Sequence, residues 1–196
     1  MLLVTAFIGP AGVGPLSAQS GTSVFTEPDQ LWVVGGYQVP AIADTFALMS
    51  ASRYPVLELG TALSFRSPLT RNIDLTIYIY PLPAEVDDPV QSEFETAVAA
   101  IYQYAASRGP EWSVSMKREE GFVQELDDGG SLTGMMAEAE YYRSAQTSRT
   151  FAYVFQKADF ILKYRITYDS DVPEDLWDYL EGWMRATASL IERYPG

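Results

Sequence analysis

Residues 151–168, FAYVFQKADFILKYRITY, alternate apolar and polar side chains almost without a break. This period of two is typical of β-strands with one buried face. A turn at Ala158-Asp159 folds the stretch into a hairpin in which a single register satisfies both faces. One face then pairs aromatic and branched residues: Phe155 with Leu162, Tyr153 with Tyr164, and Phe151 with Ile166. The other face pairs Val154 with Lys163, Ala152 with Arg165, and Thr150 with Thr167.

Strand patterns continue on the N-terminal side of this hairpin. In NIDLTIYIY, residues 72–80, four branched apolar residues share one face and alternate with polar or tyrosine side chains. The further expected strands are 45–54, 56–66, 112–126 (a strand pair or one bent strand) and 132–143. We expect a mainly antiparallel sheet of about six to seven strands.

Two amphipathic segments, 89–107 and 172–193, predict long helices. Asp88 is a suitable N-cap and Pro89 suits the first helical position of the first helix. Asp171 and Glu174 predict a capping box for the second. The sequence therefore predicts an α+β fold in which these two helices pack against the antiparallel sheet.

The chain of 196 residues divides into three parts. Residues 1–20 have the apolar run MLLVTAFI and small residues in PLSAQS, which indicate a signal peptide cleaved after Ala18 or Ser20. The basic start of such peptides is missing, so a flexible apolar tail is the alternative. Residues 21–44 are expected to be loosely structured, with a short strand and a Gly-Gly turn, and residues 45–196 to form one α+β domain. The apolar run is too short to span a membrane, and we expect a periplasmic or secreted protein.

Composition excludes several function classes. The chain has no cysteine and no histidine, which excludes thiolate nucleophiles, Ser-His-Asp triads and imidazole zinc sites. The net charge of −13 repels phosphate backbones and anionic lipids, which argues against nucleic-acid binding. Carboxylate-pair chemistry, a Lys or Tyr base, or an oxygen-ligand metal site remain open.

Lys163 and Arg165 are the first candidate site residues, because two cations stand in the middle of an alternating strand. An anion site needs a concave partner wall, which the sequence does not name. The alternative is a salt-bridge face, in which both cations point outward and reach Glu138 and Glu140 across the small Ala152 and Val154. Such exposed pairs contribute about 0–1 kcal/mol each. We favour the salt-bridge face and keep these four residues as surface candidates.

Other polar groups favour structural roles. The acids between Asp169 and Asp178 lack the glycine and terminal glutamate of a calcium loop, and helix capping explains most of them. Glu119-Glu120 and Asp127-Asp128 are pairs that glycoside hydrolysis uses, but adjacent acids on a strand point to opposite faces. The strand tyrosines Tyr78, Tyr80, Tyr141 and Tyr142 are more typical of half-buried packing than of a ligand surface. We assign no catalytic residue, no cofactor and no metal site.

The order of these segments resembles a known fold group. The strand ending IDLTIYIYPLP, an acid-capped helix, the strands closing on AYVFQKADFILKYRITY and a C-terminal helix ending ASLIERY resemble exported bacterial proteins with a PsbP-like α/β order of elements. The resemblance covers residues 45–193 and contains no catalytic motif. It implies a non-enzymatic role, because members of that fold group are mostly accessory or partner-binding proteins.

The sequence thus predicts an exported accessory protein that binds a protein partner or a small apolar ligand, as a monomer or weak dimer. The alternative is a carboxylate-dependent hydrolase that acts on cell-envelope material. A pair of inward-facing acids with raised pKa values favours the hydrolase, and an exposed apolar patch favours the binding protein.

Overall fold

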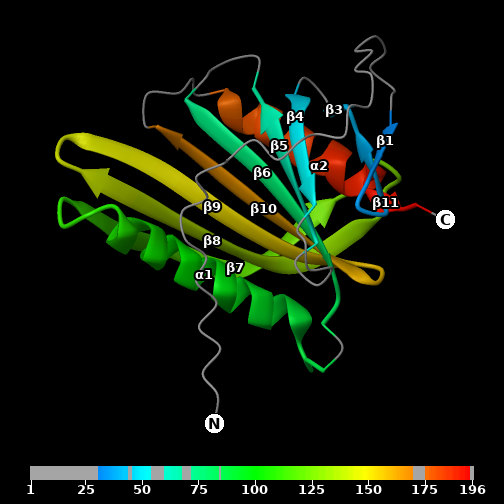
Figure 1. Ribbon diagram of the computed structural model, residues 1–196, viewed down its shortest axis with the longest axis horizontal. Helices are drawn as coiled ribbons and strands as arrows, with labels where there is room; N and C mark the ends of the chain where they lie inside the picture. The colour runs from blue at the N-terminus through cyan, green and yellow to red at the C-terminus, as the bar shows by residue number, and fades with distance from the viewer. Residues whose placement is uncertain are drawn as a thin grey trace.

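The computed structural model describes residues 31–43, 46–53, 60–67, 72–83, 85–169 and 175–194. An eight-stranded antiparallel sheet runs in the order β3-β4-β5-β6-β10-β9-β8-β7, and a three-stranded sheet has the order β1-β2-β11 (Figure 1). The strands of the large sheet are β3 (Ile42–Ala43), β4 (Phe46–Arg53), β5 (Thr61–Arg66), β6 (Ile73–Pro81), β7 (Trp112–Glu125), β8 (Ser131–Arg143), β9 (Gln146–Lys157) and β10 (Phe160–Asp169). The α+β class with a mainly antiparallel sheet is confirmed.

The hairpin of β9 and β10 has the expected register. Its turn is Ala158-Asp159, with Tyr153 opposite Tyr164 and Ala152 opposite Arg165. Ala158 has a positive φ of 51°, which the two-residue loops of hairpins require at their first position in type II′ geometry. Since β10 also pairs with β6, this hairpin lies in the middle of the sheet.

Helix α1 (Pro89–Ser107) has the expected bounds. Asp88 accepts a hydrogen bond from the backbone N–H of Gln91 at 2.9 Å, as an N-cap does. Helix α2 (Leu176–Leu190) is shorter at its C-terminal end than expected, because the chain leaves the helix at Ile191 and forms strand β11 (Glu192–Arg193). The expected capping box of Asp171 and Glu174 lies outside the described residues.

The small sheet contains the short strand and the Gly-Gly turn that are expected within residues 21–44, of which residues 31–43 are described. In the described part of that segment, β1 (Leu31–Val34) and β2 (Tyr37–Pro40) form a hairpin around Gly35-Gly36, and β11 pairs with β2. Both glycines have positive φ, which the Gly-Gly turn predicts. Tyr37 and Val39 are buried, so this hairpin belongs to the hydrophobic core.

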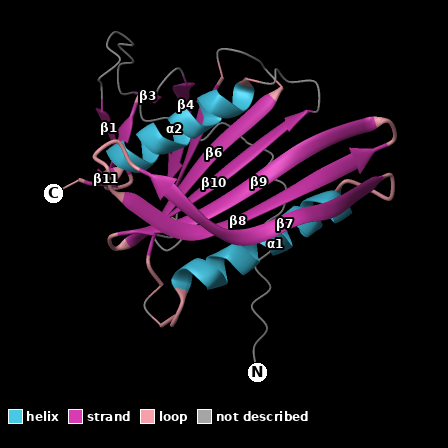
Figure 2. Cartoon of the chain, turned by 180° about the vertical axis from the view of Figure 1, so that it is seen from behind, coloured by secondary structure: helices cyan, strands magenta, loops and turns pink. Residues whose placement is uncertain are grey.

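The two helices cover opposite faces of the large sheet (Figures 1 and 2). Helix α2 packs on the face that carries Tyr153, Tyr164 and Ile166. There the ring centre of the buried Trp183 lies 5.6 Å from that of Tyr164. Helix α1 packs on the other face, against Ala137, Ala152 and other small side chains. The expectation that the face of Lys163 and Arg165 points outward is therefore wrong.

Candidate functional site

Lys163 lies between β6 and helix α1. Its ammonium is 5.0 Å from the ring centre of Tyr78 and 5.3 Å from that of Tyr80, and it forms an ion pair with Glu93 of α1. The Lys163 and Glu93 side chains are only 19% and 21% exposed. Lys163 therefore stabilises the docking of α1 on the sheet.

Arg165 also lies under α1, one pleat further along β10. It donates a hydrogen bond from Nη2 to the hydroxyl of Tyr141 at 2.8 Å, and that hydroxyl donates in turn to the carbonyl of Ile101 in α1 at 3.4 Å. Burial raises the pKa of Tyr141 above its ordinary value, which keeps the hydroxyl protonated as a donor.

Glu138 and Glu140 lie on the opposite face of the sheet from Lys163 and Arg165, which corrects the expected pairing of these four residues. The cause is the turn between β8 and β9, where two residues, Ser144 and Ala145, place Arg143 opposite Gln146. In this register Glu138 lies opposite Phe151, on the α2 face. A turn longer by one residue would place the glutamates on the α1 face.

The partners of the two glutamates are cations of β7 and β9. Glu138, almost fully buried, accepts a hydrogen bond from Arg149 and lies 3.5 Å from Arg118. Glu140 pairs with Lys117 at 2.9 Å and accepts a hydrogen bond from the Tyr142 hydroxyl. Glu138 and Glu140 do form salt bridges, but with Lys117, Arg118 and Arg149 in place of the expected Lys163 and Arg165.

A β-bulge explains how β7 supplies two adjacent cations to one face. The register of β7 on β8 shifts between Met116 and Arg118, so Lys117 is the extra residue. Because a bulge changes the direction of the side chains beside it, Lys117 and Arg118 both reach glutamates on the α2 face.

Glu138 and Glu140 form a ladder of ion pairs with Lys117, Arg118 and Arg149, which we call the ion-pair ladder. Within it, Glu140 is held in its charged form. The hydrogen bond from Tyr142, followed by that from Lys117, lowers the pKa of Glu140 below its ordinary value. A carboxylate of low pKa is poorly suited to donate a proton as a general acid near neutral pH. The arrangement can hold β7 on β8, and it can present charge at the edge of the sheet.

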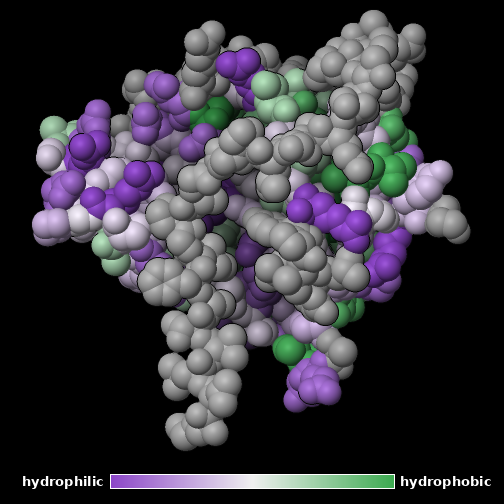
Figure 3. Space-filling view, viewed as in Figure 1, coloured by the Kyte–Doolittle hydropathy of each residue, from purple (hydrophilic) through white to green (hydrophobic). Residues whose placement is uncertain are grey.

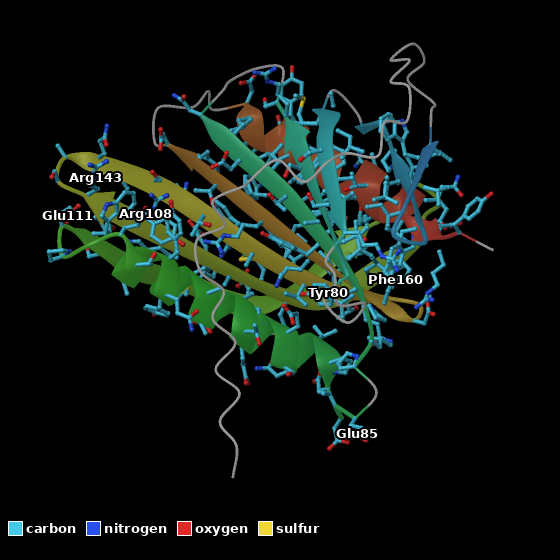
Figure 4. All side chains as sticks on the ribbon, viewed as in Figure 1. Tyr80, Glu85, Arg108, Glu111, Arg143 and Phe160 are labelled. Atoms are coloured by element: carbon cyan, nitrogen blue, oxygen red, sulfur yellow. The ribbon has the colours of Figure 1, made fainter. Side chains whose placement is uncertain are left out.

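A third cluster lies where α1 ends, β7 begins and β8 turns into β9. Three aromatic rings, those of Tyr104, Trp112 and Tyr141, contact one another at centroid distances of 5.2–6.4 Å. The arginines around them are Arg108, Arg143 and Arg165. We call these six residues the arginine–aromatic cluster; Figure 4 shows Arg108 and Arg143 at the same end of the molecule.

The guanidinium groups of this cluster lie over its rings. Arg108 lies 4.7 Å from the centre of the Tyr104 ring and 5.7 Å from that of Trp112, and it donates to the Tyr104 hydroxyl at 2.6 Å. Arg143 lies 5.6 Å from the Trp112 ring and Arg165 lies 5.9 Å from that of Tyr104. Of these residues, the sequence analysis named only Arg165 and Tyr141.

The remaining sequence candidates are solvated or structural. Glu119 and Glu120 are exposed on opposite faces, since they pair with Ala137 and Met136. Asp127, in the turn after β7, pairs with Arg185 of α2 at 3.3 Å. The two border a shallow hollow whose other lining residues are Asp175, Asp178, Tyr179, Gly182 and Ala186. Within the described ranges, no cluster of three or more acids has a geometry that could hold a metal ion.

No protein-family profile and no curated protein sequence matches the chain. Among solved structures, it is similar to cyanobacterial PsbP (CyanoP) from Synechocystis sp. PCC 6803, at 16% identity and a TM-score of 0.50, over 92% of this chain and 100% of that chain. LpqN, involved in cell envelope biogenesis of Mycobacterium tuberculosis, matches at 14% identity and a TM-score of 0.39, over 87% and 88% of the two chains. No helix of the described residues is long and apolar enough to cross a membrane. At such identities a likeness concerns the fold alone, and the PsbP-like order of elements expected for residues 45–193 is confirmed: the chain has a PsbP-like fold.

Proposed function

We propose that the chain is an exported accessory protein without enzymatic activity, which binds a protein partner through its outer surface. The observation that carries this proposal is the apolar edge of the small sheet. Leu31 and Val33 of β1 are 40% and 53% exposed, and Tyr194, 50% exposed, donates its backbone N–H to Gly36 of the same sheet at 2.9 Å. Figure 3 shows hydrophobic surface at this end of the molecule.

The edge strand β7 of the large sheet and the edge strand β1 of the small sheet differ in a way that supports a docking role for β1. Strand β7 is an edge strand with the charged run KREE at its centre and a bulge at Lys117, features that oppose pairing with a further strand. Strand β1, LWVV, carries no charge, and among the described strands it pairs with β2 alone. An apolar edge of this kind can accept a strand of a partner.

Export rests on the leader-like residues 1–20, which lie outside the described residues. Cleavage after Ala18 or Ser20 would release a chain that begins at Gln19 or Gly21. This part of the proposal is tested by the intact mass of the protein from its native envelope. A full-length cytoplasmic species would contradict it.

The hydrolase alternative has less support from the geometry. Glu138 and Glu140 hold cations in the ion-pair ladder, and the lowered pKa of Glu140 opposes a role as an acid. Glu119 and Glu120 lie on opposite faces, so they cannot act on one substrate.

The proposal is tested by photo-crosslinking in the native host. A benzoylphenylalanine at Val33 should yield a discrete adduct with one protein. Val123 is a matched control, because it is 57% exposed on the protected edge strand β7. A Val33 variant that gives no adduct, or the same adducts as the Val123 variant, would contradict the proposed partner surface.

A further inference from the structure

The arginine–aromatic cluster carries positive charge and has no carboxylate partner in the described part of the chain. The ion pairs among the described residues use Lys117, Arg118, Arg149, Lys163, Arg185 and Arg193. Arg108, Arg143 and Arg165 take part in none of them. Since the whole chain has a net charge of −13, carboxylates are abundant, and three arginines without a described carboxylate within ion-pair distance are a local exception.

Most guanidinium donors of the cluster make no hydrogen bond to another described side chain. A guanidinium carries several N–H donors in a fixed plane. Arg108 and Arg165 each donate one side-chain hydrogen bond, and both go to tyrosine hydroxyls inside the cluster. Arg108 and Arg143 are exposed. Their contacts with the rings of Tyr104 and Trp112 restrict these side chains, so less conformational entropy is lost when they bind an anion.

We propose that the arginine–aromatic cluster binds a short acidic peptide segment of a partner protein; this inference rests on the partner-binding function proposed above. A carboxylate accepts paired hydrogen bonds from a guanidinium, and the rings offer apolar surface beside it. Arg, Trp and Tyr are also the residue types that dominate binding energy at protein interfaces.

The charge of the chain limits the length of such a segment. At physiological ionic strength the Debye length is about 8 Å, so an anion at the cluster interacts with the nearby arginines and little with distant acids. A long polyanion, such as a nucleic acid or an anionic bilayer, would extend over the negative remainder of the surface and be repelled. A few carboxylates on a peptide match the cluster in charge and in extent.

Glu111 directly precedes Trp112 of the cluster in the chain. It is exposed at the same end of the molecule (Figure 4), and it folds back toward Gly109, where an added Cβ would lie 2.8 Å from its Oε2. It makes no ion pair with the cluster arginines, but its charge repels an incoming carboxylate. Glu111→Gln should therefore strengthen the binding of an acidic peptide.

The test uses the full chain and hexaglutamate, acetylated and amidated at its ends, as the probe. At low salt, hexaglutamate should shift the NMR signals of the Trp112 indole and the Arg108 and Arg143 guanidinium groups, and the binding should weaken as salt is added. Combined Arg108→Gln and Arg143→Gln should weaken binding by at least about tenfold, as loss of interface hot spots does.

The control is the combined Arg118→Gln and Arg185→Gln variant. These arginines are 48% and 50% exposed and have the same charge, but they are already ion-paired. The control should bind hexaglutamate as the unmodified chain does. An equal loss in both double variants would mean unspecific charge attraction, and would overturn the proposal.

Two further outcomes would also overturn it. Hexaglutamine that binds as well as hexaglutamate would exclude carboxylate recognition, and inorganic phosphate that binds the cluster as tightly would indicate a general anion site. The proposed function is tested separately. If Val33 gives an adduct but hexaglutamate does not bind the cluster, only the inference about the cluster is contradicted. If the Val33 variant gives no crosslink but hexaglutamate still binds, the proposed partner surface is contradicted and the peptide site is not.

Discussion

Lys157 joins the end of β9 to the end of α2, and its replacement is the most direct test of how α2 is held. Its ammonium donates to the carbonyls of Ala188, Ser189 and Ile191 at 2.7, 3.0 and 2.9 Å. The last carbonyls of a helix have no partner within it, and the same end carries a partial negative charge. The ammonium of Lys157 supplies these carbonyls with a donor and places a positive charge at this end of the helix, where the chain passes into β11.

The expected effect follows from these contacts. Lys157→Met keeps most of the aliphatic side chain and removes the ammonium, so partly buried carbonyls lose a charged donor. Net contributions of about 1.5–3 kcal/mol are usual for a hydrogen bond to a charged group. Burial lowers the pKa of Lys157, which shows that desolvation of the ammonium offsets part of this gain. We expect the free energy of unfolding to fall by about 2–4 kcal/mol.

Urea unfolding followed by far-UV circular dichroism measures this change, provided that the slope with urea is conserved. Arg193→Met is the control, because Arg193 lies on the adjacent β11 but is 51% exposed and pairs with Asp159, which is 61% exposed. It should cost less than about 1 kcal/mol. Equal losses in the two variants, or a loss below about 0.5 kcal/mol for Lys157→Met, would refute the reasoning.

Three further predictions concern the sheet. Leu162→Ala should lower the free energy of unfolding by about 2–5 kcal/mol in thermal or urea melts, because Leu162 is fully buried. Arg165→Ala should cost about 1–3 kcal/mol, since it deprives the buried Tyr141 hydroxyl of its closest partner; a neutral effect would contradict a role under α1. The pKa of Glu140 is lowered from 4.5 in the folded state, so its contribution to stability is present above that pH and is lost as the pH falls through the folded pKa. Glu140→Gln should thus be less stable than the unmodified chain at pH 7 and lose less stability on acidification, which melts from pH 7 to pH 3 would test.

The parts of the fold that the sequence predicts are those decided by local signals. The alternation in residues 151–168 permits a single hairpin register, and Asp88 and Pro89 determine the start of α1. Each of these signals lies within a few residues of the feature that it determines. The same holds for the Gly35-Gly36 turn of the small sheet.

The faces of Glu138 and Glu140 could not be predicted in this way. The pattern of β8 shows which of its residues share a face, but the pairing with β9 depends on the length of the turn between them. Ser144 and Ala145 are not the residues that two-residue loops prefer, although Ser144 has a positive φ of 54°. A one-residue change in this loop exchanges the two faces of β8, so the glutamates could not be placed on the correct face without knowing this turn.

The position of α1 had a signal that the sequence analysis did not use. On the face that it covers, β8 and β9 carry Ala137, Ala139 and Ala152, and these small side chains leave room for a helix. Helix α1 presents Ala97 and Ala105 to the same core. Small residues on both surfaces allow a close approach of helix and sheet, which a solvent-exposed face would not need.

The docking of α1 also determines what each cation of the cluster can do. Residues 108 and 165 are far apart in the chain, and the packing of α1 brings their guanidinium groups to 4.7 and 5.9 Å from the centre of the Tyr104 ring. Arg165 lies under the helix and donates a hydrogen bond to the Tyr141 hydroxyl, so it helps to hold α1 on the sheet. Arg108 and Arg143 are exposed, and Arg108 donates one hydrogen bond, to the Tyr104 hydroxyl. The stability of the Arg165 variant and the peptide affinity of the Arg108 and Arg143 variant therefore measure different properties of one cluster, and a variant pair that changed both equally would contradict this division of roles.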